Sequence, residues 1–158
     1  MDKIPFTFSG LELIKSELND LKKNERPQII QAISSAREHG DLKENAEYHA
    51  AKDKQAFVEG RITELEDVIS RADVIDLSKL SGDTITFGAK VKILDEDTNH
   101  ETDYHIVGPY EANLDAGLIS IASPIAKALI GKEEGMLVEV ITPSGIKNYE
   151  VLSITIPK

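Results

Sequence analysis

The sequence contains no cysteine and no tryptophan among its 158 residues. Without cysteine the chain has no disulfide framework, no thiol nucleophile and no thiolate ligand for zinc or an iron–sulfur cluster. This excludes thiol-based redox chemistry and a disulfide-stabilised secreted domain. It also favours a reducing compartment.

Long apolar runs are absent as well. No stretch approaches the roughly 18 consecutive apolar residues that a membrane-spanning helix needs. The N-terminal residues MDKIPFTFSG do not have the apolar core of a signal peptide. We therefore expect a cytoplasmic protein with no membrane partner.

Positive charge is scarce: 18 lysine and arginine residues stand against 28 aspartate and glutamate residues, for a net charge of −10. A protein that binds nucleic acid in general neutralises phosphates with clustered lysine and arginine side chains. The composition therefore argues against such an affinity. Any contact with nucleic acid has to be local, or guided by another protein.

The pattern of apolar residues changes near Lys79. Before it, they recur in steps of three and four, which is typical of amphipathic helices; the positions are Leu11, Ile14, Leu18 and Leu21, then Val58, Ile62, Leu65, Ile69 and Ala72. After it, short β-branched or alternating segments predict strands; these are residues 84–94, 103–107, 118–121, 137–141 and 149–156. The sequence predicts an α+β fold, an antiparallel helical hairpin followed by a small antiparallel β-sheet domain. We place the hairpin at 1–76, a linker at 77–82 and the sheet domain at 83–158.

The start of the first helix carries a capping signal. Ser9 and Glu12 have the spacing of a capping box, and Phe8 is placed to pack against Leu13 as a hydrophobic staple. We expect the helix to begin there.

The first helix is expected to run to about His39, where Gly40 supplies a left-handed stop. Pro27 inside it should kink or locally unwind the helix. Pairing the apolar positions of the two helices antiparallel places the turn just after Gly40. Two arms of roughly 30 residues each would project on the order of 45 Å.

The predicted turn carries Asp41 and Glu44, for which two interpretations stay open. They can form a second capping box at the start of the second helix. Alternatively, two carboxylates within one helical turn can contribute oxygen ligands to Mg²⁺. Two carboxylates are too few for a complete shell, so the remaining ligands would come from another protein.

Arg37 and Lys52 flank this acidic turn, and either can contact a phosphate or simply face solvent. In the second half, Ser123 has the position of an N-cap and Pro124 that of a first helical residue. They predict one short helix that runs to Ile130 and is stopped by Gly131.

The run Ala36–Ala51 closely resembles the tip of the Gre factors, the transcript cleavage factors of bacterial RNA polymerase. The similarity extends to Glu59–Arg61, to Leu118–Ala126 and to Leu129–Glu134. It implies a coiled-coil N-terminal domain and an FKBP-like C-terminal domain. It also implies a monomer that enters the secondary channel of RNA polymerase and promotes cleavage of backtracked RNA.

The resemblance further assigns roles to single residues. Asp41 and Glu44 match the family's acidic pair, which is thought to help hold Mg²⁺ inside the polymerase, with no metal expected on the free protein. Arg37 and Lys52 match a basic patch that is thought to touch the 3′ end of the nascent RNA, and many relatives have arginine at the second position. By this resemblance the chain is a catalytic accessory of the polymerase, not an enzyme.

Ser123 and Pro124 match a serine–proline pair at the family's polymerase-binding helix. The preceding residue is Ala122, where relatives often have aspartate or asparagine. Three other functions are considered. They are an FKBP-like isomerase or chaperone, an inhibitory relative that occupies the channel without promoting cleavage, and a coiled-coil scaffold. The domain has few aromatic residues for an isomerase pocket, and the intact GDLKE pattern favours stimulation over inhibition.

Overall fold

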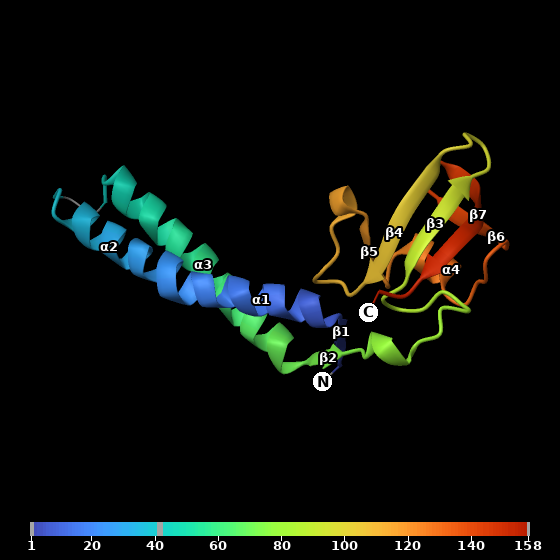
Figure 1. Ribbon diagram of the computed structural model, residues 1–158. Coiled ribbons are helices and arrows are strands. Elements are labelled where there is room, and N and C mark those ends of the chain that lie inside the picture. The colour runs from blue at the N-terminus through green and yellow to red at the C-terminus, as the bar shows by residue number, and fades with distance from the viewer. Residues whose placement is uncertain (1, 41–42, 158) are drawn as a thin grey trace. The chain divides into compact units, whose positions relative to one another are not determined.

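The structure is a computed structural model that describes residues 2–40 and 43–157. The chain forms two compact units, one of residues 11–71 and one of residues 1–10 together with 72–158. The first is helical and the second contains a curled sheet (Figure 1), which confirms the predicted α+β class. The expected boundaries at 76 and 83 stay a prediction. The first ten residues group with the sheet unit because β1 (Ile4–Phe6) pairs with β2 (Ala72–Val74).

Three helices and one short π-helical segment build the hairpin. They are α1 (Phe8–Asp20), the π-helical segment Leu21–Glu25, α2 (Arg26–Arg37) and α3 (Ala46–Ser70). The α2 and α3 helices lie side by side in opposite directions. Among the described residues none of the helices is long and apolar enough to cross a membrane.

The break in the α-helical pattern lies just before Pro27, as the sequence predicts. The N–H of Arg26 donates to the carbonyl of Leu21, five residues earlier. Proline has no N–H and its ring crowds the carbonyl four residues before it. The chain widens to the five-residue hydrogen-bond spacing of a π-helix at this point, which confirms the expected local unwinding.

The predicted apolar seam between the helices is present. Ile29 of α2 is buried against Val58 and Ile62 of α3, and Leu18, Leu21 and Ile33 pack around them. The placement of Leu21 and Ile62 in one cluster confirms the expected antiparallel pairing. Burying apolar side chains along this seam stabilises the hairpin by removing their surface from water.

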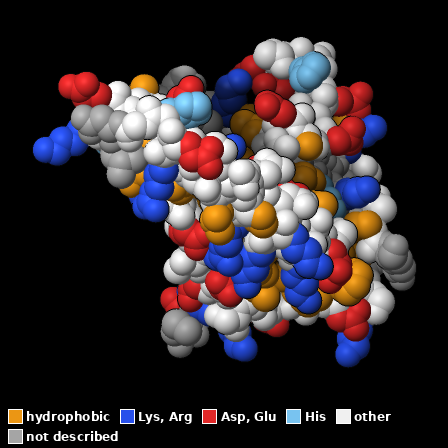
Figure 2. All heavy atoms as spheres, turned by 90° about the vertical axis from the view of Figure 1, so that its left-hand side faces the viewer, with side chains coloured by type: hydrophobic (Ala, Val, Ile, Leu, Met, Phe, Trp, Pro, Cys, Tyr) orange, Lys and Arg blue, Asp and Glu red, His pale blue; other side chains and the backbone are white. Residues whose placement is uncertain are grey.

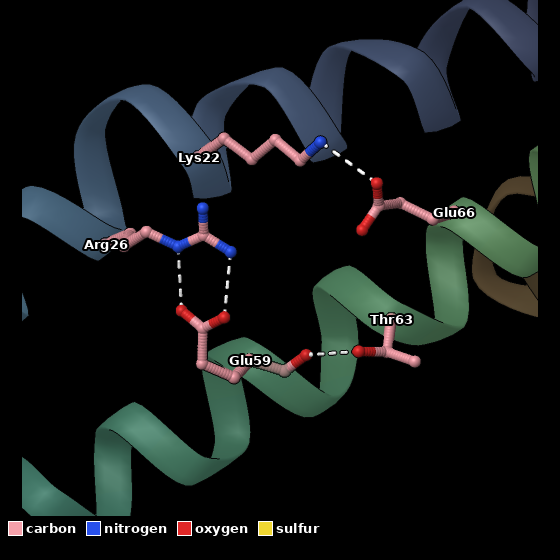
Figure 3. A network of polar contacts seen from close by, with 5 residues as sticks. All are labelled: Lys22, Arg26, Glu59, Thr63 and Glu66. Atoms are coloured by element: carbon pink, nitrogen blue, oxygen red, sulfur yellow. Dashed lines mark hydrogen bonds and ion pairs between the residues drawn. The ribbon is translucent and has the colours of Figure 1, made fainter.

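Charged pairs cross the seam on its solvent side (Figure 3). The guanidinium of Arg26 donates through Nε and Nη2 to both carboxylate oxygens of Glu59, each at 2.8 Å. This bidentate contact raises the pKa of Arg26 and lowers the pKa of Glu59. Lys22 Nζ lies 3.0 Å from a carboxylate oxygen of Glu66. These exposed pairs add contacts to the register that the buried apolar seam sets, and the Arg26–Glu59 contact is planar and directional.

The predicted cap of the first helix is wrong. The helix begins at Phe8, and the hydroxyl of Thr7 accepts the N–H of Gly10 at 3.1 Å. Ser9 therefore lies inside the helix. Phe8 and Leu13 are 70% and 72% exposed, so the expected staple does not form.

The start of α1 is held by Glu111, far along the chain. Its carboxylate accepts the N–H of Thr7 at 2.6 Å and the hydroxyl of Thr7 at 2.7 Å. A carboxylate is also favoured at a helix N-terminus by the helix dipole. This contact explains why Thr7, and not Ser9, caps the helix.

The main sheet has the order β5-β4-β3-β7-β6. Its strands are β3 (Lys90–Asp95), β4 (Glu101–Val107), β5 (Leu118–Ser120), β6 (Leu137–Thr142) and β7 (Gly145–Thr155). Its neighbours are antiparallel except β4 and β5, which are parallel. The expectation of a purely antiparallel sheet is therefore wrong at this one pair. The strand predicted over 84–94 begins only at Lys90, because residues 86–89 form a turn in which the N–H of Ala89 donates to the carbonyl of Thr86 and Gly88 takes a φ of +88°.

One face of the sheet is covered by α4 (Pro124–Leu129). Ala126 and Leu129 of this helix are fully buried against inward-facing residues of the strands, including Val91, Ile93 and Ile106. Because side chains alternate along a strand, the neighbours of these residues on β3 and β4 face away from α4. The sheet unit therefore has one apolar covered face and one polar outer face.

We predict that Gly10→Ala destabilises the protein, although alanine favours helices over glycine by about 1 kcal/mol. A Cβ at this position would overlap the carboxylate of Glu111. Moving that carboxylate breaks its two hydrogen bonds to Thr7. We expect a net loss of about 1–2 kcal/mol in the free energy of unfolding, measured by urea denaturation.

The control is the same substitution in a Glu111→Ala background. There the overlap is gone, and Gly10→Ala should become stabilising through helix propensity alone. A stabilising effect in the wild-type background would show that the Glu111 contact contributes little.

Candidate functional site

The turn between α2 and α3 begins where α2 ends at Arg37. The N–H of His39 donates to the carbonyl of Ala36, and Gly40 takes a φ of +112°, a conformation that side chains other than glycine's rarely adopt. This confirms the expected role of Gly40 in ending the first arm. Arg37 and His39 are exposed at this end.

Asn45 closes the turn from the other side. Its side-chain oxygen accepts the N–H of Tyr48 at 3.0 Å and so caps α3. Its Nδ2 donates to the carbonyl of Ala36 at 2.6 Å, at the end of α2. One amide side chain thus satisfies a backbone donor of one helix and a backbone acceptor of the other.

The capping-box role proposed for Glu44 is therefore wrong. The second helix starts at Ala46, so Glu44 precedes the N-cap and cannot be its third helical residue. Asn45 is the functional residue that sequence reasoning missed, although asparagine is among the preferred N-cap residues. Asp41 lies outside the described residues.

Glu44 is exposed in a shallow hollow of about 470 Å³. The hollow is lined by His39, Glu44, Asn45, Ala46 and Glu47. Carboxylate oxygens are the ligands that Mg²⁺ prefers, so the chemistry of Glu44 fits the expected metal. In residues 2–40 and 43–157, however, no group of three or more His, Asp or Glu side chains is arranged to hold a metal ion. On these residues Glu44 can supply only part of a shell.

The two predicted RNA contacts come together. Arg37 of α2 and Lys52 of α3 line one hollow of about 300 Å³, together with Ile30, Ile33, Ser34 and Gln55. Lys52 Nζ donates to the side-chain oxygen of Gln55 at 2.9 Å, which steadies the lysine without neutralising it. Figure 2, which looks at the molecule from the left-hand side of Figure 1, shows acidic, basic and histidine side chains on the surface seen from there. The positive charge of Arg37 and Lys52 is confined to this hollow, which agrees with a chain whose net charge is −10.

His49 and Tyr48 support the turn. His49 Nε2 lies 3.0 Å from the carbonyl of Lys43, and because a carbonyl only accepts, the imidazole donates. The rings of Tyr48 and His49 meet edge to face, with centroids 5.5 Å apart. His49 is therefore occupied with the backbone just before the cap.

Ser123 and Pro124 lie at the start of α4, in the other unit. The hydroxyl of Ser123 accepts the N–H of Ala126 at 3.3 Å, which confirms the predicted N-cap. Pro124 is exposed as the first helical residue. Their role in binding polymerase stays a prediction.

Comparison with known proteins identifies the chain. Residues 4–74 match the family described as transcription elongation factor, N-terminal, and residues 80–156 match the family described as transcription elongation factor, GreA/GreB, C-term. The transcription elongation factor GreA of Rhodospirillum rubrum is 61% identical over 154 residues, which cover 98% of each chain. The chain belongs to the GreA/GreB family of transcription elongation factors. This confirms the resemblance drawn from the turn sequence.

A second GreA factor is similarly close, and a related solved structure is more distant. The GreA factor of Ruegeria pomeroyi is 62% identical over 154 residues, again 98% of each chain. Among solved structures, the GreA factor homolog 1 of Thermus thermophilus is 30% identical, covers 97% of this chain and 99% of that one, and superposes with a TM-score of 0.44.

We predict that Asn45→Ala destabilises the hairpin by about 1–2 kcal/mol, because it removes both the cap of α3 and the bond to α2. Asn45→Asp keeps an acceptor for the N–H of Tyr48 but loses the donor to Ala36. It should therefore fall between wild type and Asn45→Ala. The measurement is chemical denaturation followed by far-UV circular dichroism. Equal stability of all three proteins would contradict the bridging role of Asn45.

Proposed function

We propose that this chain enters the secondary channel of bacterial RNA polymerase and stimulates cleavage of the nascent RNA in backtracked complexes. Elongation then resumes from the new 3′ end. The observation that carries the proposal is the turn of the hairpin, where the exposed Glu44 follows Arg37 closely and Lys52 shares a hollow with that arginine. Family membership supports the same function.

In this proposal the hairpin acts as a catalytic accessory and the active site belongs to the polymerase. Asp41 and Glu44 would contribute carboxylate oxygens to Mg²⁺ held mainly by the polymerase. When bound, Mg²⁺ supplies charge stabilisation to the attacking and leaving oxygens of phosphodiester hydrolysis. The chain's own part is to present Glu44 on a short exposed segment that Asn45 fixes between two helix ends.

The basic residues hold the RNA. Arg37 offers a planar guanidinium that can donate two parallel hydrogen bonds to one phosphate. Lys52 offers a point charge on the facing helix, with its ammonium group restrained by Gln55. Together they would position a phosphate of the extruded 3′ segment beside the acidic turn.

The sheet unit docks the factor on the polymerase rim through Ser123 and Pro124. The N-cap bond to Ala126 fixes the first turn of α4, and the exposed ring of Pro124 offers a rigid apolar contact. The neighbouring Ala122 has no polar side chain to add. We place this reaction in the cytoplasm, with the chain as a monomer.

We predict that Asp41→Asn and Glu44→Gln each reduce stimulated cleavage by about tenfold or more, as loss of a metal-site oxygen does. Polymerase binding should persist, since the docking surface lies in the other unit. The measurement is transcript cleavage by a stalled, backtracked elongation complex at limiting Mg²⁺.

The matched control is Glu38→Gln, which removes one exposed carboxylate close to the turn. It should leave cleavage nearly unchanged, and thermal melts of all three variants should stay close to wild type. Normal cleavage by Glu44→Gln and Asp41→Asn would refute the metal-binding role. Binding without any cleavage by the wild-type chain would identify an inhibitory channel-binding factor instead.

We also predict that Lys52→Gln weakens stimulated cleavage and that Lys52→Arg restores or exceeds wild-type activity. Arginine keeps the charge and adds a bidentate donor, whereas glutamine removes the charge. The readout is the concentration of factor that gives half-maximal cleavage. Lys54→Gln on the same helix serves as the charge-matched control. An equal effect of Lys52→Gln and Lys54→Gln would mean that general charge, and not the hollow with Arg37, governs RNA contact.

A further inference from the structure

The outer face of the main sheet carries a second basic site, distinct from the hairpin turn. Lys90 and Lys92 lie two residues apart on β3, so both side chains point to the same face. Val91, which lies between the two lysines, and Ile93, which follows Lys92, are buried in one cluster with Ala126 and Leu129 of α4. The two lysines therefore face away from that helix, into solvent.

Neighbouring strands place polar groups on either side of these lysines. In the sheet register Lys90 lies between Thr155 of β7 and His105 of β4. Lys92 lies between Ser153 of β7 and Asp103 of β4. These six residues form two cross-strand rows on one rigid three-stranded surface.

The surface is hollowed. A depression of about 500 Å³ is lined by all six of these residues and bounded at the β5 side by Ala116, Gly117 and Leu118. A second depression of about 690 Å³ shares Lys90 and His105 and extends to Ser9, Asp76 and Ser78. Lys90 and His105 thus lie at the border of two adjoining hollows.

Neither lysine is neutralised. Within residues 2–40 and 43–157, the ammonium groups of Lys90 and Lys92 form no ion pair, although carboxylates outnumber basic side chains in this protein by ten. Asp103 is the one acidic residue in the two rows and does not come within 4.0 Å of Lys92 Nζ. Two uncompensated positive charges in an acidic protein make this face locally attractive to anions.

His105 borders the site, but its ring N–H is used by the backbone. Its Nε2 donates to the carbonyl of Gly88 at 3.1 Å, which fixes the ring on the sheet. Partial burial and the charge of Lys90 lower the pKa of His105. This shift disfavours the charged imidazole, so the positive charge of the two rows rests on the lysines.

We propose that this outer face of β7, β3 and β4 binds phosphate groups, with Lys90 and Lys92 as the charged contacts and the hydroxyls of Ser153 and Thr155 as further donors. A phosphate presents three acceptor oxygens and up to two negative charges, which suits ammonium and hydroxyl donors that converge from adjacent strands. Two lysines about 6.6 Å apart along a strand can contact two linked phosphates.

The lining favours phosphate over base recognition. Tyr104 is the aromatic residue among the described lining residues, and its side chain packs against the core instead of offering a stacking surface. Sites for single-stranded bases usually need such exposed aromatic platforms. The source of the phosphates is therefore either a free phosphorylated molecule or the backbone of a nucleic acid. The proposal does not depend on transcript cleavage.

The test is a titration of the full-length protein with inorganic pyrophosphate, followed by amide chemical shifts in nuclear magnetic resonance spectra. We expect saturable shifts in β3, β4 and β7. The double variant Lys90→Gln/Lys92→Gln should weaken binding by about tenfold or more, because charge-assisted hydrogen bonds to the anion are lost. The double variant Lys54→Gln/Lys127→Gln removes the same charge elsewhere and should bind as wild type does.

A parallel titration with a short single-stranded oligonucleotide distinguishes the two sources. Saturable binding of pyrophosphate assigns the face to a phosphorylated small molecule, and binding of the oligonucleotide alone assigns it to a nucleic-acid backbone. The proposal is overturned if neither probe shifts these strands, or if both double variants lose affinity equally. Thermal melts confirm that the exposed substitutions leave the fold intact.

Discussion

The antiparallel packing of α2 against α3 is the constraint on which the candidate site depends. Burial of Ile29 against Val58 and Ile62 fixes which turns of the two helices lie opposite each other. Two helices paired in this way must meet at one end, and there Asn45 joins the last turn of one to the first turn of the other. The seam therefore decides that Arg37 and Lys52 face one hollow.

Electrostatics follows from the same packing. Along the hairpin, three basic residues pair with carboxylates across the seam: Lys22 with Glu66, Arg26 with Glu59 and Arg61 with Glu17. A chain with an excess of acidic residues can therefore still have small basic sites where lysine or arginine forms no ion pair with a carboxylate. Lys90 and Lys92 escape such pairing because their cross-strand neighbours are mostly hydroxyl and imidazole groups. Net charge excludes a broad nucleic-acid surface but says little about individual anion contacts.

The sequence predicted more of the fold than of the helix ends. Helical periodicity, the break before Pro27 and the Ser123 cap are local properties, and all three are confirmed. The caps of the two long helices were not predicted correctly, because several residues that can cap a helix lie close together near each helix start. Thr7, and not Ser9, caps the first helix, and Glu111, 104 residues away, binds Thr7 through two hydrogen bonds. Asn45 caps the second helix because its other amide atom reaches the end of α2.

The sequence by itself determined the class of each half, the position of the turn and the identity of the charged residues around it. These follow from spacing along the chain, which sets the faces of helices and strands. The tertiary structure decided the parallel pairing of β4 with β5, the small β1–β2 sheet and the rows around Lys90 and Lys92. Strand order and register depend on contacts between segments that are distant in the sequence. A local pattern of residues does not show which of these contacts is the more stable.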